Sequence, residues 1–191
     1  MNKILKTVPP EIPVGSTILY PTETVYGLGC RYDDEEALAS IYRLKGRDSK
    51  VPVALIASDR SWVEAHFQLP HSATALMDAH WPGPLAMLLK PKDLERFRNV
   101  IHEGLVGVRV SGSRVSRDLA AACGGGVVST SANLSGEPTP LSWQQCPSSI
   151  QEGVSLVIDG GELVAAPPST LIRFNEAGAI DVLRQGSVRV N

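Results

Sequence analysis

Residues 20–29 read Tyr-Pro-Thr-Glu-Thr-Val-Tyr-Gly-Leu-Gly, and the short run Thr17-Ile18-Leu19 comes directly before them. An apolar run that leads into a proline and a hydroxyl-rich, glycine-closed segment is typical of a strand entering a ligand-facing turn. We therefore expect a strand over residues 17–20 and a binding loop after it.

A second feature follows about twenty residues later, where the chain reads Lys45-Gly46-Arg47. The pattern of residues 34–44 predicts an amphipathic helix, so both cations are expected to be exposed at its end. Two cations held so close repel each other unless an anion lies between them, which favours a phosphate or carboxylate site. The alternative is a solvated helix end whose cations complement the helix dipole.

Composition limits the class of protein. At 191 residues the chain suits one domain, residues 1–191, large enough to bury its own core. The net charge of −2 argues against general electrostatic binding to nucleic acid. A local basic patch remains, because the four cations of residues 43–50, less Asp48, give a charge of +3.

The sequence lacks the motifs of several common kinds of catalytic and binding site. The three cysteines, Cys30, Cys123 and Cys146, have no metal-ligand spacing, and the four histidines lie outside every motif. There is no P-loop, dinucleotide fingerprint or nucleophile elbow. No apolar run is long enough for a signal peptide or a membrane span. We expect a cytoplasmic protein with reduced thiols and no metal-binding side chains.

Strands and helices alternate along most of the chain, which predicts an α/β fold with a mixed sheet. The expected strands are residues 17–20, 52–57, 85–90, 106–110, 127–129 and 156–159, with a hairpin of 170–174 and 179–184. The expected helices are residues 34–44, 59–66, 72–80 and 113–122.

Taken in order, the motifs resemble those of the YrdC family of threonylcarbamoyl-AMP synthases, in its short single-domain form. Residues 21–29 resemble the opening loop of that family, and Lys45-Gly46-Arg47 with Ser131-Ala132-Asn133 resembles its Lys-x-Arg…Ser-x-Asn signature. Further matching segments are residues 81–85, 108–110, 159–161, 169–170 and 183–186. The resemblance implies an open, twisted mixed β-sheet with flanking helices and a concave basic face.

The resemblance also implies a reaction. L-threonine, bicarbonate and ATP, with Mg²⁺ on the nucleotide, would give threonylcarbamoyl-AMP and pyrophosphate for the t6A modification of tRNA at position 37. Downstream tRNA threonylcarbamoyl transferase proteins would then use the product. Such chemistry needs anions brought together and cations on the phosphates rather than a covalent nucleophile.

The family roles carry over to matching positions of this chain. The implied catalytic residues are Lys45, Arg47, Ser131 and Asn133. The implied threonine-binding residues are Thr22, Arg109, Ser129 and Ser169. The implied ATP-binding residues are Lys45, Arg47, Ser131, Thr139 and Arg184. Without the resemblance, residues 131–133 read as a turn and Arg109 as an outward polar residue on a half-buried strand.

Three positions depart from the family pattern. Asp48 stands where a proline is usual, Ser111-Gly112-Ser113 where a His-Pro pair is frequent, and Pro168 where a glutamate is usual. Two alternative functions stay open at this point. One is an RNA-binding module, for which the few aromatic residues are unfavourable; the other is a catalytically silent paralogue, which Asp48 favours.

Overall fold

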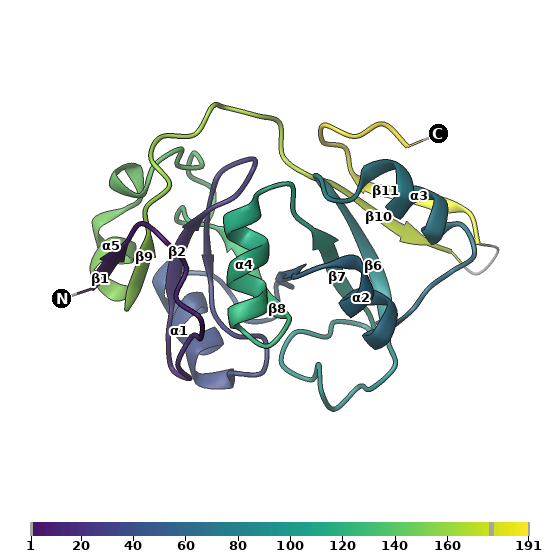
Figure 1. Cartoon of the computed structure of the whole chain (residues 1–191), viewed down its shortest axis with the longest axis horizontal. Coiled ribbons are helices and arrows are strands. Elements are labelled where there is room, and N and C mark those ends of the chain that lie inside the picture. Colours follow the sequence, from purple (N-terminus) through teal and green to yellow (C-terminus); the bar gives the residue numbers. More distant parts are fainter. Residues whose placement is uncertain (1, 176–177, 191) are drawn as a thin grey trace.

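A computed structural model describes residues 2–175 and 178–190 of the chain, and its strands form one mixed sheet flanked by helices (Figure 1). The strands are β1 (Lys3–Leu5), β2 (Ile18–Pro21), β3 (Tyr26–Gly29), β4 (Ala54–Ala57), β5 (Phe67–Gln68), β6 (Leu85–Pro91), β7 (Val106–Val110), β8 (Gly126–Ser131), β9 (Leu156–Ile158), β10 (Thr170–Phe174) and β11 (Ile180–Arg184). The helices are α1 (Glu35–Lys45), α2 (Arg60–His66), α3 (Ala73–His80), α4 (Arg114–Ala122), α5 (Ser148–Gly153) and the 3₁₀ turn η1 (Trp143–Gln145).

The strand order confirms the expected open, mixed sheet. Neighbouring strands run β1-β9-β2-β3-β8-β4-β7-β6-β10-β11, and the short β5 pairs with β6. Parallel pairs such as β4 with β7 and β6 with β10 alternate with antiparallel pairs such as β3 with β8. Every predicted element is present within a few residues at its ends, whereas β1, β3, β5, η1 and α5 were not predicted.

Two hydrophobic cores lie on opposite faces of the sheet because side chains alternate along each strand. On β2, Leu19 belongs to the larger core, whereas Ile18 and Tyr20 belong to the smaller one. Helix α4 covers the smaller core, where its Leu119 packs, and Figure 1 shows this helix across the middle of the sheet. Helices α1, α2, α3 and α5 contribute to the larger core.

Strand β3 replaces part of the loop that residues 20–29 predict. Residues 26–29 pair with both β2 and β8, so the loop is restricted to residues 22–25. At Gly29 an added Cβ would lie 2.1 Å from the carbonyl oxygen of Val128. Glycine is therefore required where β3 passes close to the backbone of β8. The glycines that suggested a loop instead allow a buried strand.

Helix α1 has clear ends. The Asp34 side chain accepts a hydrogen bond from the backbone N–H of Ala37, as an N-cap should. Gly46 ends the helix in the left-handed conformation, with φ 58° and ψ 37°. This turn sends the side chains on either side of Gly46, those of Lys45 and Arg47, in different directions.

Among residues 2–175 and 178–190, no helix is long and apolar enough to cross a membrane.

Candidate active site

A cavity of about 570 Å³ lies over the middle and the β10–β11 end of the sheet. On β6, β7 and β10, every second side chain lines it, and the side chains between them belong to the larger core. On β4 and β8, Ala54 and Ser129 line the cavity and share a face with Ile56 and Val127, which pack beneath α4. The cavity therefore lies on the α4 face of the sheet, beside that helix.

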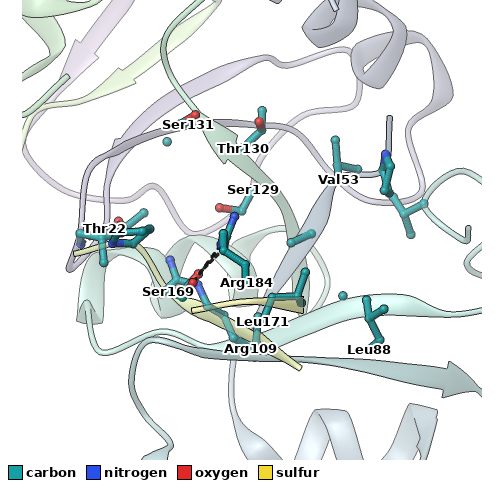
Figure 2. Close-up of a pocket in the computed structure, with 18 of the residues that line it drawn as sticks. Thr22, Val53, Leu88, Arg109, Ser129, Thr130, Ser131, Ser169, Leu171 and Arg184 are labelled. Atoms are coloured by element: carbon teal, nitrogen blue, oxygen red, sulfur yellow. Dashed lines mark hydrogen bonds between the residues drawn. The ribbon is translucent and has the colours of Figure 1, made fainter. Parts of the chain in front are cut away.

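The two ends of the cavity differ in chemistry (Figure 2). Thr22, Arg109, Ser169 and Arg184 gather at one end, and Figure 2 shows Arg184 bonded to Ser169 there. Figure 2 shows Val53 and Leu88 on the side away from Thr22, and Leu171 beside Arg109 and Arg184. The other large apolar side chains that line the cavity are Val100 and Leu105. Small residues on the sheet, Ala54, Ala86 and Gly107, leave room above the strands. A ligand with a charged part and a flat apolar part suits such a site.

Four arginines line the cavity: Arg47, Arg109, Arg173 and Arg184. Among residues 2–175 and 178–190, Glu103, at the exposed tip of the 92–105 segment, is the one acidic residue that lines it. The expected concave basic surface is therefore present, although the chain as a whole is slightly acidic. A basic cavity in an acidic chain favours a small anionic ligand over nucleic acid.

Arg109 lies on β7 and is buried, with 6% of its surface exposed. This corrects the alternative interpretation of Arg109 as an outward polar residue. Its guanidinium forms an ion pair with Glu23, and Glu23 also accepts a hydrogen bond from the Ser111 hydroxyl. Ser111 belongs to residues 111–113, which depart from the family pattern. One of the residues that differ from the family therefore contacts a side chain at the site.

Arg184 reaches the same end of the cavity from β11. Its Nε donates to the Ser169 carbonyl oxygen at 3.0 Å, and its Nη2 donates to the Ser169 hydroxyl at 2.9 Å. Burial, and then the positive charge of Arg109, lower the pKa of Arg184. The two guanidinium groups are thus close enough to repel each other, and an anion between them would relieve that repulsion.

Lys45 is not exposed, contrary to the expectation from the helix pattern. Only 3% of its surface is exposed, and its ammonium donates to the carbonyl oxygens of Ser131 and Asn133, the latter at 2.8 Å. Burial and the nearby Arg47 lower the pKa of Lys45 to about 8. Lys45 therefore ties the end of α1 to the end of β8 and does not line the cavity.

Arg47, by contrast, lies on the cavity wall. Its guanidinium donates to the Thr130 hydroxyl at 3.2 Å and to the Pro52 carbonyl oxygen at 2.9 Å. The neighbouring Asp48 is exposed and accepts a hydrogen bond from the backbone N–H of Lys50. Asp48 does not line the cavity, so the departure at this position leaves the wall unchanged.

The Ser131-Ala132-Asn133 segment is a turn whose side chains bond to each other. Ser131 donates its hydroxyl hydrogen to the Asn133 side-chain oxygen, and Asn133 donates to the Glu137 carbonyl oxygen at 2.6 Å. Ser131 lines the cavity, whereas Asn133 is buried behind it. The turn and site interpretations of this segment are therefore compatible.

The Thr22 hydroxyl closes the 22–25 loop. It donates to the Val25 carbonyl oxygen at 2.7 Å and accepts from the backbone N–H groups of Thr24 and Val25, each at 3.1 Å. Thr22 lines the cavity with only 4% of its surface exposed. Because its hydrogen atom is already donated, the hydroxyl serves first to shape the loop.

Most of the site residues expected from the sequence meet in the cavity. Those that line it are Thr22, Arg47, Arg109, Ser129, Ser131, Thr139, Ser169 and Arg184. Lys45 and Asn133 instead lie behind Ser131. The structure adds residues that the sequence did not single out. They are Glu23, Ser111, Arg173 and the pair His102 and Glu103.

The described part of the chain contains neither an activated thiol nor a cluster of metal-binding side chains. The three cysteines are free and buried, and burial raises the pKa of Cys123 to about 12 and that of Cys146 to about 11. Within residues 2–175 and 178–190, no three His, Cys, Asp or Glu side chains come together as a metal site.

Comparison with known proteins agrees with this geometry. A family model, Sua5/YciO/YrdC, described as telomere recombination, matches residues 12–186. A threonylcarbamoyl-AMP synthase of Chromohalobacter salexigens is 40% identical over 161 residues, which are 82% of this chain and 85% of that protein.

Two solved structures share the fold. The Pyrococcus abyssi Sua5 protein in complex with L-threonine superposes with a TM-score of 0.77 and 30% identity, over 90% of this chain and 51% of that one. The E. coli protein YciO superposes with a TM-score of 0.78 and 26% identity, over 97% of this chain and 96% of that one. The chain thus spans about half the length of the Pyrococcus protein. With its cavity, its signature residues and a family match that covers most of its length, the chain belongs to the Sua5/YciO/YrdC family.

Proposed function

We propose that the protein is an L-threonylcarbamoyladenylate synthase, which joins L-threonine, bicarbonate and ATP into threonylcarbamoyl-AMP and pyrophosphate. The observation that carries this proposal is the convergence of Arg47, Arg109 and Arg184 on one cavity that also has an apolar end. Relatives that are named for this activity support it, as does the Pyrococcus protein in complex with L-threonine.

The roles of the residues follow from their places. Arg109 pairs with the threonine carboxylate, because a guanidinium can hold both carboxylate oxygens. Arg47 meets the ATP phosphates. Ser129, Ser131, Thr139 and Ser169 supply hydrogen bonds along the wall between these two cations. Arg184 holds the nucleotide beside Ser169.

The chemical step needs proximity and charge stabilisation. Bicarbonate takes up a proton and loses water to give CO2. The neutral threonine amine adds to CO2 and releases a proton, and an oxygen of the resulting carbamate attacks the α-phosphate of ATP. The new bond joins the carbamate oxygen to phosphorus, and the bond to pyrophosphate breaks. Arg47 stabilises the negative charge that develops on the phosphates as pyrophosphate leaves. Mg²⁺ would bind mainly through the phosphates, because this ion uses few protein ligands when phosphates are present. It would neutralise part of the phosphate charge.

Lys45 and Asn133 have positioning roles in this scheme. Lys45 donates to two carbonyl oxygens of the 131–133 turn, and the Asn133 side chain accepts from the Ser131 hydroxyl within that turn. Together they fix the Ser131 hydroxyl at the cavity wall. This differs from the direct phosphate contact that the resemblance implies for Lys45. Asp48 is exposed and does not line the cavity, which weakens the interpretation of the chain as a silent paralogue.

The product would serve the t6A modification of tRNA. Threonylcarbamoyl-AMP is a mixed anhydride that water destroys, so downstream tRNA threonylcarbamoyl transferase proteins must take it up promptly. We place the protein in the cytoplasm, where its three free cysteines stay reduced. Weak RNA binding at the basic cavity would be secondary to this activity.

An assay of pyrophosphate release tests the proposal. Purified protein is incubated with ATP, L-threonine, bicarbonate and Mg²⁺, and each component is left out in turn. We expect pyrophosphate only when all three substrates are present. Release of ADP without threonine would contradict the proposal, and so would a complete absence of turnover in a folded protein.

A further inference from the structure

Glu23 contacts the charged end of the cavity through Arg109, and none of the proposed substrate contacts uses it. One of its carboxylate oxygens accepts from the Arg109 guanidinium, and the other accepts from the Ser111 hydroxyl. Glu23 does not itself line the cavity, whereas Arg109 does. Arg109 therefore lies between this carboxylate and the space where a ligand would bind.

The position of Glu23 is fixed from both sides. On one side, the Thr22 hydroxyl closes the loop that carries Glu23 through its bonds to residues 24 and 25. On the other side, Arg117 donates to the carbonyl oxygens of Ser111 and Gly112 and holds the segment that contacts Glu23. The Ser116 hydroxyl also bonds to the Pro21 carbonyl oxygen at 2.9 Å. Bonds from α4 therefore hold the backbone on both sides of the Glu23 carboxylate.

The charges at this end of the cavity form a small group. Arg109 and Arg184 supply two positive charges, and Glu23 supplies one negative charge, so the group carries one net positive charge. Arg184 donates its hydrogen bonds to the neutral Ser169. A site with one net positive charge suits a monovalent carboxylate, whereas a polyphosphate would prefer a more positive site.

We propose that Glu23 is a positioning and selectivity residue, which aims Arg109 at the amino acid and makes the Arg109 guanidinium a poorer partner for phosphates. This inference rests on the proposed function, because it assigns the two anionic substrates to different cations. Glu23 orients the guanidinium so that its free N–H groups face the cavity. It also lowers the local charge that would otherwise attract pyrophosphate or the ATP phosphates.

Removing the charge of Glu23 should lower the affinity for threonine and raise the affinity for pyrophosphate. Threonine carries an ammonium as well as a carboxylate, so it gains little from an added positive charge. It also loses the fixed orientation of Arg109. Pyrophosphate carries several negative charges and gains attraction from each added positive charge. If the role of Glu23 were purely structural, its substitution would lower the affinity for threonine and for pyrophosphate together.

The test is calorimetric titration of the folded protein with L-threonine and, separately, with pyrophosphate. For Glu23→Gln we expect threonine affinity to fall about ten-fold, the usual order for losing an oriented charged contact. We expect pyrophosphate affinity to rise in the same variant. Glu103→Gln is the matched control, because it removes the same charge from the cavity wall without touching Arg109.

Ser111→Ala supplies a second, independent measurement. It keeps the Glu23 carboxylate and removes one of its anchors, so threonine affinity should fall less than in Glu23→Gln and pyrophosphate affinity should not rise. Circular dichroism establishes that each variant is folded.

An unchanged ratio of threonine to pyrophosphate affinity in folded Glu23→Gln would overturn the selectivity role. The same shift in Glu103→Gln would do so too, because it would show a general effect of charge. If the parent protein bound threonine in neither the presence nor the absence of ATP, the proposed function itself would fail, and this inference with it.

Discussion

Lys45 and Arg47 are two cations separated by a single glycine, yet they lie in different environments. Lys45 is buried and donates to backbone carbonyl oxygens, whereas Arg47 lines the cavity. The left-handed conformation of Gly46 separates them, because it turns the chain between the two side chains. The comparison teaches that one signature motif contains both a residue that holds the site together and a residue that faces the ligand.

The largest expected effect concerns the residue that faces the ligand. Arg47→Ala should weaken ATP binding by roughly ten- to a hundred-fold, because a charge-assisted phosphate contact contributes about 1.5–3 kcal/mol. The free energy of unfolding should change little. Arg43→Ala is the control, since Arg43 is exposed in the last turn of α1, just before Arg47, and bonds to Ser40. Equal ATP affinities for Arg47→Ala and the parent, measured by calorimetry, would remove Arg47 from the site.

Lys45→Ala should act first on stability. The change leaves the carbonyl oxygens of Ser131 and Asn133 without their buried donor, which should lower the free energy of unfolding by about 1.5–3 kcal/mol. Urea unfolding measures this loss, with Lys50→Ala as the exposed lysine control. A Lys45→Ala protein as stable as the parent, but unable to bind ATP, would reverse the roles assigned to the two cations.

Arg109 extends the comparison to a third cation. Arg109→Lys should weaken threonine binding by about ten-fold while ATP affinity stays nearly unchanged, because an ammonium lacks the planar fork of a guanidinium. Separate calorimetric titrations with each ligand measure this, with the exposed Arg114→Lys as control. Weakened ATP binding with normal threonine binding would assign Arg109 to the phosphates instead.

The smallest expected effect is a pH dependence of stability. The pKa of Lys45 in the folded protein is about 8, below its ordinary value of 10.5. Between these values the unfolded chain binds more protons than the folded one, so this group makes the protein more stable as the pH rises from 8 to 10.5. Relative to Lys45→Met, the parent should therefore gain stability over this range. Parallel stability curves for the two proteins would contradict the lowered pKa of Lys45 in the folded protein.

Local sequence signals predicted most of the fold. The apolar run before Pro21 and the capped pattern of α1 appear in the structure almost where expected. Strand β3 was missed because its glycines suggest a loop, although Gly29 is there to let β3 approach Val128. Short elements such as β1 and α5 give too few residues for a period to be recognised.

The site was predicted less evenly than the fold. The resemblance supplied most of the cavity-lining residues, but it gave no sign that Lys45 is buried, since a lysine at a helix end is normally exposed. The pair of Glu23 and Arg109 joins positions 86 residues apart in the chain. In the sheet, β3, β8 and β4 lie between β2 and β7. The contact therefore depends on the course of the 22–25 loop, and no local pattern reveals it.

The central claim is that this cavity forms threonylcarbamoyl-AMP. The most direct test incubates the protein with ATP, L-threonine and ¹³C-bicarbonate and follows the nucleotide products by mass spectrometry. We predict an adenylate that contains threonine and one ¹³C atom, formed by the parent and strongly reduced in Arg47→Ala. An unlabelled adenylate, or ADP formed in place of an adenylate, would contradict the account.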